Sequence, residues 1–496
     1  RGFQNLIMPS LTMDKINHDI IKTSYQVRGA VYLAAQERLR NGGEVIFTSV
    51  GNPQGLGQVP LTFLRQVIAL VAAPYLMDDP KFAGMFPNDA IVRAREFLSE
   101  TKSLGAYTDS RGSLQVRNKV AAFLERRDGL PSDPERIFLT DGASAAVRIG
   151  LQFLIRGHGF KDGILVPIPQ YPLYSASIAL YGGILIPYEL EEDDDWGLNM
   201  NSITRAIASA RKFNICPRGL VFINPGNPTG QQLTEDQLAS LLTVCHQEEL
   251  CLLADEVYQD NVYGDARPFI SARQVLKKIG GDVLAETEVM TFHTTSKGAL
   301  GECGLRGGMV ELLNINEDVR AQMYKLASIN LSPNVPGQVA MSVLVQPPVP
   351  GDESYELWES ERTAVLASLE RRANAITAAL NELEGVSCVA AGSLYAFPKI
   401  TLPPAAICKA KRDGVSPDVL YCLELLGHAG IATTPGSGFG QKDGTYHFRT
   451  TILVSEDKLD AFVERIKAFH EHFMAKYKAM SVDEERDLGD TGMCRL

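Results

Sequence analysis

Residues 251–258 read Cys-Leu-Leu-Ala-Asp-Glu-Val-Tyr, an apolar run that ends abruptly in a carboxylate. Such a run is typical of a buried strand that leads into a ligand site. Similar apolar runs recur along the chain at Ile137–Thr140, Ile164–Pro167, Ile184–Tyr188, Leu220–Ile223 and Val289–His293. Segments of helical length, such as Thr234–Gln247, separate them. This alternation predicts an α/β fold built on a mostly parallel sheet that is covered on both faces.

Composition narrows the class of protein. The chain has 496 residues, 45% hydrophobic and 22% charged, which predicts a globular protein of two domains. A net charge of -11 argues against non-specific nucleic-acid binding. The 8 cysteines have no metal-ligand spacing, so we expect neither a disulfide framework nor a metal site. Scattered free cysteines are typical of a reducing compartment such as the cytoplasm. No apolar run approaches the roughly 18 residues of a membrane span.

The second half of the chain differs in pattern from the first. Trp358–Leu383 indicates one long helix, and a final helix is expected to end near Lys478. Between them, short strands are predicted at Tyr395–Ile400, Ile431–Thr434 and His447–Leu453. We therefore predict an N-terminal arm and part of a small domain at 1–84, a large domain at 85–350, and a smaller C-terminal α/β domain at 351–496.

Polar clusters follow several of the predicted strands, where parallel sheets bind ligands. After Ile137–Thr140, Gly142 permits a tight turn and Ser144 can cap the next helix, whose free N–H groups suit a phosphate. An ordinary helix cap is the alternative. After Leu220–Ile223, two Asn-Pro pairs in residues 224–230 predict a rigid loop that holds Asn227 as a fixed donor. The alternative here is a structural turn.

Two further clusters carry charge. Asp255 leaves a buried strand end and needs a cationic partner, for which a protonated pyridine nitrogen is suited, and Tyr258 could reach the same ligand. A salt-bridged Asp beside a packed Tyr is the alternative. After Val289–His293, a desolvated Lys297 could attack an aldehyde as the neutral amine, with Ser296 and Arg306 holding an anion nearby. A surface lysine in a glycine-rich loop is the alternative.

Together and in this order, the four clusters resemble the class I/II aminotransferases of pyridoxal-phosphate (PLP) fold type I, over nearly the whole chain. The resemblance implies that Lys297 carries the PLP cofactor as an imine and that Asp255 pairs with its ring nitrogen. It also implies that Asn227 and Tyr258 bond its phenolic oxygen and that Tyr171 stacks on its ring. The phosphate would be bound by Ala143, Ser144, Ser296 and Arg306.

The resemblance extends to the substrate and to a partner. Arg449, in Tyr446-His-Phe-Arg-Thr-Thr451, would bind the substrate α-carboxylate, because a bidentate guanidinium suits that group. Asn227 and Gly51 would also contact the substrate. Tyr107, in Gly105-Ala-Tyr-Thr-Asp-Ser-Arg-Gly112, would reach the phosphate of a neighbouring subunit, which implies a homodimer. A surface arginine and a turn aromatic are the respective alternatives.

A finer pattern is similar to the alanine aminotransferase family. It is carried by Gly51-Asn-Pro-Gln54, by Gly436-Ser-Gly-Phe-Gly440 and by the motifs around Lys297 and Arg449. The implied reaction converts L-alanine and 2-oxoglutarate to pyruvate and L-glutamate by a ping-pong route. Glutamate:glyoxylate and alanine:glyoxylate exchange are alternatives, because Ala299 and Met309 stand where aromatic residues are expected.

Other classes of protein fit less well. A PLP-dependent Cα-elimination enzyme would keep the same cofactor residues. A non-catalytic regulator would need a DNA-binding domain, and a nicotinamide-dependent dehydrogenase would need a G-x-G-x-x-G loop after its first strand. The terminal Cys494-Arg495-Leu496 resembles a peroxisomal address, so that location and a mitochondrial one stay open beside the cytoplasm.

Overall fold

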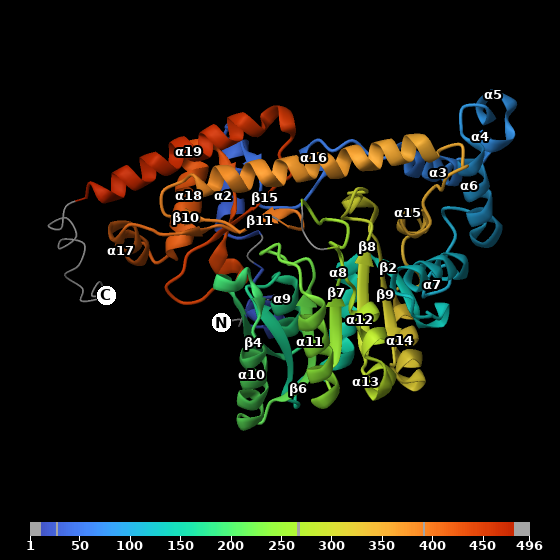
Figure 1. Ribbon diagram of the computed structural model, residues 1–496, viewed down its shortest axis with the longest axis horizontal. Helices are drawn as coiled ribbons and strands as arrows, with labels where there is room; N and C mark the ends of the chain where they lie inside the picture. The colour runs from blue at the N-terminus through green and yellow to red at the C-terminus, as the bar shows by residue number, and fades with distance from the viewer. Residues whose placement is uncertain (1–10, 26–27, 265–267, 390–391, 481–496) are drawn as a thin grey trace, which may run out of the picture.

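The structure, a computed structural model, describes residues 11–25, 28–264, 268–389 and 392–480. The tripeptide Cys494-Arg495-Leu496 lies outside these ranges. The chain forms a large body around the main sheet and a smaller body beside it (Figure 1). The long helix α16 (Tyr355–Asn381) runs along both bodies, and α19 (Glu456–Lys478) runs beside it over the smaller one. These two helices confirm the long C-terminal helices that the sequence predicts.

Within the described residues, the main sheet has eight strands in the order β2-β9-β8-β7-β6-β3-β4-β5. Neighbours from β8 through β4 pair in parallel, so the prediction of a mostly parallel α/β sheet is confirmed. All six predicted apolar runs lie in its strands, whereas β9 and β5 were not predicted. The strands are β2 (Ile137–Asp141), β3 (Asp162–Ile168), β4 (Ile184–Glu191), β5 (Gly197–Leu198), β6 (Cys216–Ile223), β7 (Cys251–Asp255), β8 (Val289–Thr294) and β9 (Gly307–Leu313).

The direction of the strands decides which loops can meet. Strand β9 pairs antiparallel with both β2 and β8. Therefore β2 points the same way as β8, and the carboxyl ends of β2, β6, β7 and β8 lie at one edge of the sheet. Strand β9 begins at that edge, directly after Arg306. The polar segments that follow these strands are thereby gathered in one place.

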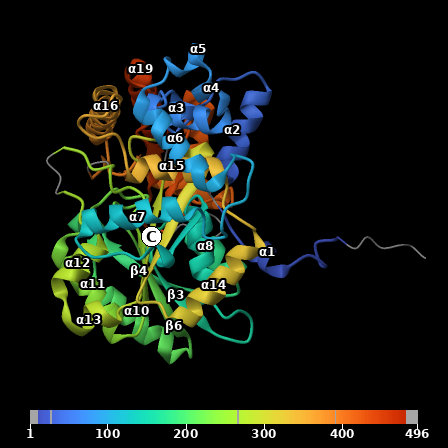
Figure 2. The ribbon, with the colours of Figure 1, turned by 90° about the vertical axis from the view of Figure 1, so that its right-hand side faces the viewer.

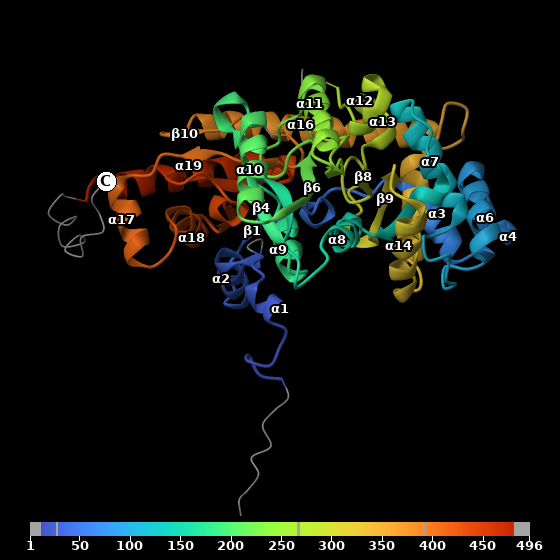
Figure 3. The ribbon, with the colours of Figure 1, turned by 90° about the horizontal axis from the view of Figure 1, so that it is seen from below.

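Helices cover both faces of the sheet, and alternating side chains of the strands meet them. Val221 and Ile223 of β6 pack in one cluster with α8 (Ala143–Leu154) and α9 (Leu173–Leu180). Leu220 and Phe222 pack on the other face with α10 (Met200–Lys212), α11 (Glu235–Gln247) and α12 (Ala272–Ile279). Figure 3 shows these two groups on opposite sides of the strands. This burial on both faces explains why the strands are apolar throughout.

The smaller body is built from short strands and helices. Strand β15 (Phe448–Thr451) lies between β11 (Tyr395–Ala396) and β14 (Thr434–Pro435). The predicted strand at residues 395–400 is divided, because Pro398 has no N–H to continue the ladder. The other strands are β1 (Ile46–Phe47), which pairs with β13 (Ile431–Ala432), and β10 (Val386–Ser387), which pairs with β12 (Lys399–Ile400). Its remaining helices are α2 (Ala30–Arg40), α17 (Pro404–Arg412) and α18 (Pro417–Ala429).

A third group of helices packs at the far end of α16 from the smaller body. Helix α3 (Thr62–Ala72) contacts α6 (Asn88–Thr101) and α15 (Val335–Val345) in one hydrophobic cluster, visible beside α16 in Figure 2. The boundaries at 84/85 and 350/351 stay predictions. The remaining helices are α1 (His18–Lys22), α4 (Tyr75–Asp78), α5 (Pro80–Ala83), α7 (Leu114–Asp128), α13 (Gly281–Glu286) and α14 (Glu317–Ile329). None of the described helices has the length and apolar character that a membrane crossing needs.

Candidate active site

The polar segments at the edge of the sheet meet around one cavity of about 200 Å³, which the smaller body closes on one side. Every predicted site residue except Tyr107 lines it: Gly51, Ala143, Ser144, Tyr171, Asn227, Asp255, Tyr258, Ser296, Lys297, Arg306 and Arg449. Tyr107 is 77% exposed and does not line this cavity. Its role across a subunit interface stays a prediction.

Asp255 brings a buried carboxylate to the floor of the cavity. Asp255 is the last residue of β7 and is buried, and the hydroxyl of Tyr174 donates to its Oδ2 at 2.7 Å. Its Oδ1 is also buried and has no hydrogen-bond partner within the described residues. Burial raises the pKa of Asp255 to about 6, although the Tyr174 hydrogen bond opposes this rise. One carboxylate oxygen is therefore left to pair with a donor or a cation in the cavity.

The start of α8 and Arg306 form a positive end of the cavity. The prediction that Ser144 caps this helix is wrong: α8 begins at Ala143, its N-cap is Gly142, and no side chain caps it. Gly142 has a φ of 79°, which favours glycine, and an added Cβ would collide with the Arg306 guanidinium. Arg306 itself donates to the carbonyl oxygens of Asp141 and Cys303 at 3.2 and 2.9 Å. An uncapped helix N-terminus beside a guanidinium suits an anion such as a phosphate.

Lys297 lies beyond the end of β8 and is half-buried. Its Nζ lies 5.2 Å from the centre of the Tyr258 ring. The backbone N–H of the next residue, Gly298, donates to Asn261 Oδ1 at 2.9 Å, which fixes the segment. An amine held in this way, in contact with the cavity, can react with a carbonyl group there.

Arg449 reaches the cavity from β15 of the smaller body and is 1% exposed. It donates from Nη1 to Asn227 Oδ1 at 3.0 Å and from Nη2 to the Ser49 carbonyl at 2.5 Å. Its Nε has no partner, and no carboxylate of the described residues forms an ion pair with it. A buried guanidinium without a carboxylate, with an N–H to spare, suits the carboxylate of a ligand.

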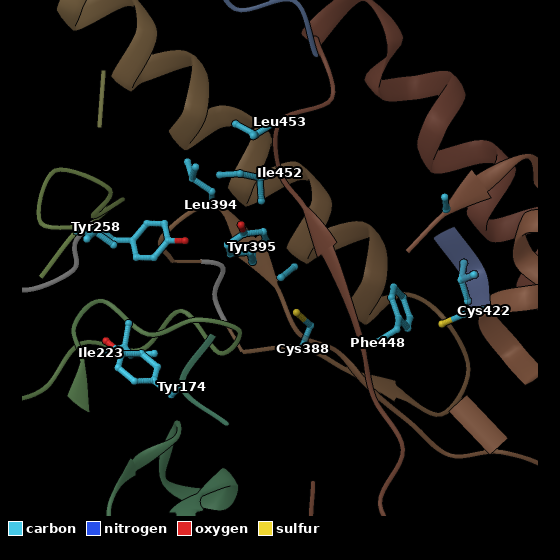
Figure 4. Packing of buried hydrophobic residues seen from close by; sticks show 14 of the residues in the cluster. Tyr174, Ile223, Tyr258, Cys388, Leu394, Tyr395, Cys422, Phe448, Ile452 and Leu453 are labelled. Atoms are coloured by element: carbon cyan, nitrogen blue, oxygen red, sulfur yellow. The ribbon is translucent and has the colours of Figure 1, made fainter. Parts of the chain in front are cut away.

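Asn227 connects the Arg449 guanidinium to Tyr258 through two hydrogen bonds. While its Oδ1 accepts from Arg449, its Nδ2 donates to the Tyr258 hydroxyl at 3.2 Å. The rigid loop therefore holds Asn227 between two site residues. Figure 4 shows the Tyr258 ring pointing toward Tyr395, with Tyr174 and Ile223 below.

Sequence reasoning missed several residues. Tyr174, in the first turn of α9, supports Asp255 from behind the cavity wall, and its place close to Tyr171 in the sequence was an available signal. Tyr395 and Cys303 line the cavity, but the sequence around them gave no signal of a ligand site. Ala299 and Met309, predicted to affect substrate range, do not line the cavity. Both are buried in the hydrophobic cluster that α3, α6 and α15 share with β2.

Comparison with known proteins agrees with this geometry. Residues 65–466 match the family described as aminotransferase class I and II, and the chain belongs to this family. It is 51% identical over 474 residues to glutamate–glyoxylate aminotransferase 1 of Arabidopsis thaliana, covering 95% of this chain and 98% of that one. It is 47% identical over 485 residues to a probable mitochondrial alanine aminotransferase of Dictyostelium discoideum, covering 95% and 90%.

The fold has the same relatives. The solved structure of an alanine aminotransferase from Pyrococcus furiosus superimposes with a TM-score of 0.73 at 24% identity, over 92% of this chain and 100% of that one. The predicted membership of the class I/II aminotransferases and the fold type I architecture are thus confirmed. The chain is an aminotransferase of a PLP-dependent family.

Proposed function

We propose that the cavity binds PLP and transfers an amino group between L-alanine and 2-oxoglutarate. The observation that carries the proposal is the buried carboxylate of Asp255, whose Oδ1 has no hydrogen-bond partner within the described residues and lies in the same cavity as Lys297. A protonated ring nitrogen would satisfy that oxygen, and the amine suits an aldehyde. The start of α8 and Arg306 suit the phosphate, so three separate parts of the cavity fit three parts of one cofactor.

The proposed roles follow from these contacts. Asp255 would hold the ring nitrogen, and Asn227 and Tyr258 would bond the phenolic oxygen. Tyr171, whose hydroxyl lies 3.0 Å from that of Tyr25, would cover the ring and exclude water. The phosphate would be held by Ala143, Ser144, Ser296 and Arg306. PLP, when bound, withdraws electrons from the Cα of the attached amino acid.

Within that frame, the chain's own residues orient the substrate and move its proton. Arg449 would bind the α-carboxylate through Nε and one Nη, since its other donors are taken by Asn227 and Ser49. The fixed Asn227 keeps the guanidinium in place while this happens. Lys297 would take the proton from the substrate Cα at its Nζ and hold it there as the general acid for the second proton transfer. Gly51 leaves room for the substrate beside this amine.

The choice of substrate rests on the relatives rather than on the walls of the cavity. Its cationic side chains, among the residues described, are Lys297, Arg306 and Arg449, and each already has a proposed role. Both candidate reactions pair one dicarboxylic substrate with one small one, so the cations do not separate them. The 47% identical relative from Dictyostelium, a probable alanine aminotransferase, supports L-alanine. The second candidate is glutamate:glyoxylate exchange, which the 51% identical Arabidopsis relative favours.

Initial rates with each donor and acceptor would decide between these reactions. We expect L-alanine with 2-oxoglutarate to give pyruvate, with the parallel double-reciprocal lines of a ping-pong route. A kcat/KM that is higher for L-glutamate with glyoxylate would assign the second candidate. Turnover of S-adenosylmethionine without an oxo acid would instead point to Cα elimination and contradict amino transfer.

We also propose that the active unit is a homodimer in which Tyr107 reaches the neighbouring site. Tyr107, Ile329 and Leu331 are 77%, 75% and 54% exposed. The Ser110 hydroxyl donates to the Leu331 carbonyl at 2.6 Å, which joins the segment that contains Tyr107 to the end of α14. An apolar surface of this kind suits burial in an interface. Light scattering would measure the mass, and Tyr107→Phe mixed with Lys297→Ala should yield hybrid dimers with one intact site. Monomers, or no recovered activity in the mixture, would contradict the proposal.

A further inference from the structure

Tyr395 is a buried side chain of the cavity to which none of the roles above applies. It is 4% exposed and lies on β11, where its backbone pairs with Thr451 of β15. The two strands place Tyr395 two residues along the sheet from Arg449. The tyrosine is therefore fixed to the same small sheet as the carboxylate clamp.

The ring of Tyr395 supports the guanidinium of Arg449. The Cζ of Arg449 lies 4.0 Å from the centre of the Tyr395 ring and 4.7 Å from that of Phe439. Such contacts stabilise a desolvated guanidinium and fix its plane. This interaction uses only the face of the ring, while the hydroxyl interacts with the Tyr258 hydroxyl and with the charge of Lys297.

The hydroxyl of Tyr395 extends toward Lys297. A Cβ built on Gly51 would collide with the Tyr395 hydroxyl and would lie 3.5 Å from Lys297 Nζ. The hydroxyl and the amine therefore both border the small volume beside the Gly51 Cα. Gly51 is required there because any side chain would separate them.

The charges around Tyr395 favour the loss of its proton. Burial alone would raise the pKa of Tyr395, but the positive charges of Lys297 and Arg449 hold it below its ordinary value. The other titratable groups that face it are Tyr258, Tyr171 and Cys303. Burial and the neighbouring Tyr395 and Tyr171 raise the pKa of Tyr258 well above its ordinary value, so the shifts of the two neighbouring hydroxyls have opposite directions.

We propose, on the basis of the amino-transfer function proposed above, that Tyr395 is a positioning residue that holds the Lys297 amine on the side of the cavity where Arg449 binds the substrate. In this contact the Tyr395 O–H donates to the neutral amine, or the ammonium donates to the phenolate. The two forms differ only in the place of one proton, so the net charge of the pair does not change. Tyr395 thus links the carboxylate clamp, through its ring, to the proton-carrying amine, through its hydroxyl.

Tyr395→Phe separates these two functions because it keeps the ring and removes the hydroxyl. We expect kcat for amino transfer to fall roughly 10- to 100-fold, as for a misplaced reacting group, while KM for both substrates stays unchanged. The isotope effect with Cα-deuterated L-alanine should increase. Tyr477→Phe is the matched control, since it removes another buried hydroxyl, which donates to Glu424 away from the cavity. An unchanged kcat, or a raised KM with unchanged kcat, would overturn the proposal.

A titration that does not depend on turnover tests the same contact. The ultraviolet tyrosinate absorption of the purified holoenzyme should show one tyrosine ionising below the others. That step should be missing in Tyr395→Phe and should move to higher pH in Lys297→Ala, where a positive charge is lost. A step that stays in place in Lys297→Ala overturns the inference even if amino transfer is observed. A wild-type protein without any amino transfer would instead overturn the proposed function, and the titration would still report on the contact.

Discussion

Asp255 and Glu256 are neighbours at the end of β7, and both are buried, yet they belong to different environments. Asp255 faces the cavity, where it accepts from Tyr174 and keeps one oxygen without a partner in the described residues. Glu256 faces the opposite side, where its Oε1 accepts from the backbone N–H of Ala272 at 2.7 Å. Its Oε2 also has no hydrogen bond within the described residues, but it lies 3.2 Å from Arg127 Nη2, within ion-pair distance. Burial raises both pKa values, to about 6 for Asp255 and about 7 for Glu256.

The difference between the two sides is the supply of cations. On the Glu256 side, Arg127 also pairs with Asp128 at 2.7 Å, and Arg273 pairs with Asp128 at 3.0 Å and with Glu311 at 2.7 Å. On the Asp255 side, the charge of Lys297 opposes the rise in the pKa of the carboxylate, but no lysine or arginine of the described residues forms an ion pair with it. A buried carboxylate that serves stability is thus given a cation by the fold, whereas one that serves a ligand is left to obtain it from the ligand.

The largest effect is expected from a substitution on the Glu256 side, where the buried carboxylates pair with arginines. Arg273→Leu would leave Asp128 and Glu311 buried with too few cations, and we expect the free energy of unfolding to fall by about 3–5 kcal/mol. Urea denaturation followed by circular dichroism would measure this loss. Lys278→Ala is the control, because it breaks an exposed pair with Glu235 that contributes less than about 1 kcal/mol. Equal effects of the two variants would contradict the distinction.

A substitution on the Asp255 side should reduce the catalytic rate instead of the stability. Asp255→Asn keeps an acceptor for Tyr174 but removes the negative charge, and we expect kcat to fall about 10²–10³-fold without loss of stability. Glu256→Gln is the matched control at the adjacent position, and it should retain kcat. Steady-state rates and urea midpoints of both variants would test this. If Glu256→Gln lost as much kcat as Asp255→Asn, the two sides could not be told apart by function.

The comparison also predicts how stability depends on pH in the protein without cofactor. The pKa of Asp255 is raised from 3.8 to about 6 on folding, so the folded state binds its proton more tightly. The stabilisation of the folded state by this proton is fully present below pH about 4. It falls by about 3 kcal/mol as the pH rises through about 6. The difference in urea midpoint between wild type and Asp255→Asn should therefore change across this range. Adding PLP should reduce that change, and a constant difference would contradict the raised pKa.

The smallest effect is expected from Tyr174→Phe, which removes the hydrogen bond to Asp255. The hydrogen bond from Tyr174 stabilises the charged carboxylate, so its loss should raise the pKa of Asp255 further. We expect a fall in kcat of about 10-fold, equivalent to about 1.4 kcal/mol. Rates measured between pH 5 and 8 would show the loss to be largest on the acid side. Tyr188→Phe is the control, since its hydroxyl donates to the Val221 carbonyl at 2.7 Å.

Much of this arrangement could be predicted because local patterns carry it. The apolar runs before Asp255 and Lys297 predicted strands, and the polar residues after them predicted the edge at which the cavity lies. Strand β9 is not predicted by the sequence because it begins with Gly307 and Gly308, which continue the pattern of the preceding glycine-rich loop. Ser144 was assigned as a cap because its residue type allows it, whereas the positive φ of Gly142 is a property of the folded turn.

Contacts between segments far apart in the chain could not be predicted in this way. Tyr395 enters the cavity only because β11 pairs with β15, and no local pattern encodes that pairing. In the same way, nothing near Glu256 indicates that Arg127, more than a hundred residues earlier, is its cation. Ala299 adjoins the Lys297 segment in sequence, but its backbone turns it into the hydrophobic core.

The central claim is that Asp255, Lys297 and Arg449 form one PLP-dependent amino-transfer site. The most direct test is the visible absorption of the purified protein with PLP, recorded before and after L-alanine and then 2-oxoglutarate. We predict a long-wavelength cofactor band that is lost with L-alanine, restored by 2-oxoglutarate, and absent in Lys297→Ala together with turnover. A Lys297→Ala variant that keeps both the band and the amino transfer of the wild type would contradict the account.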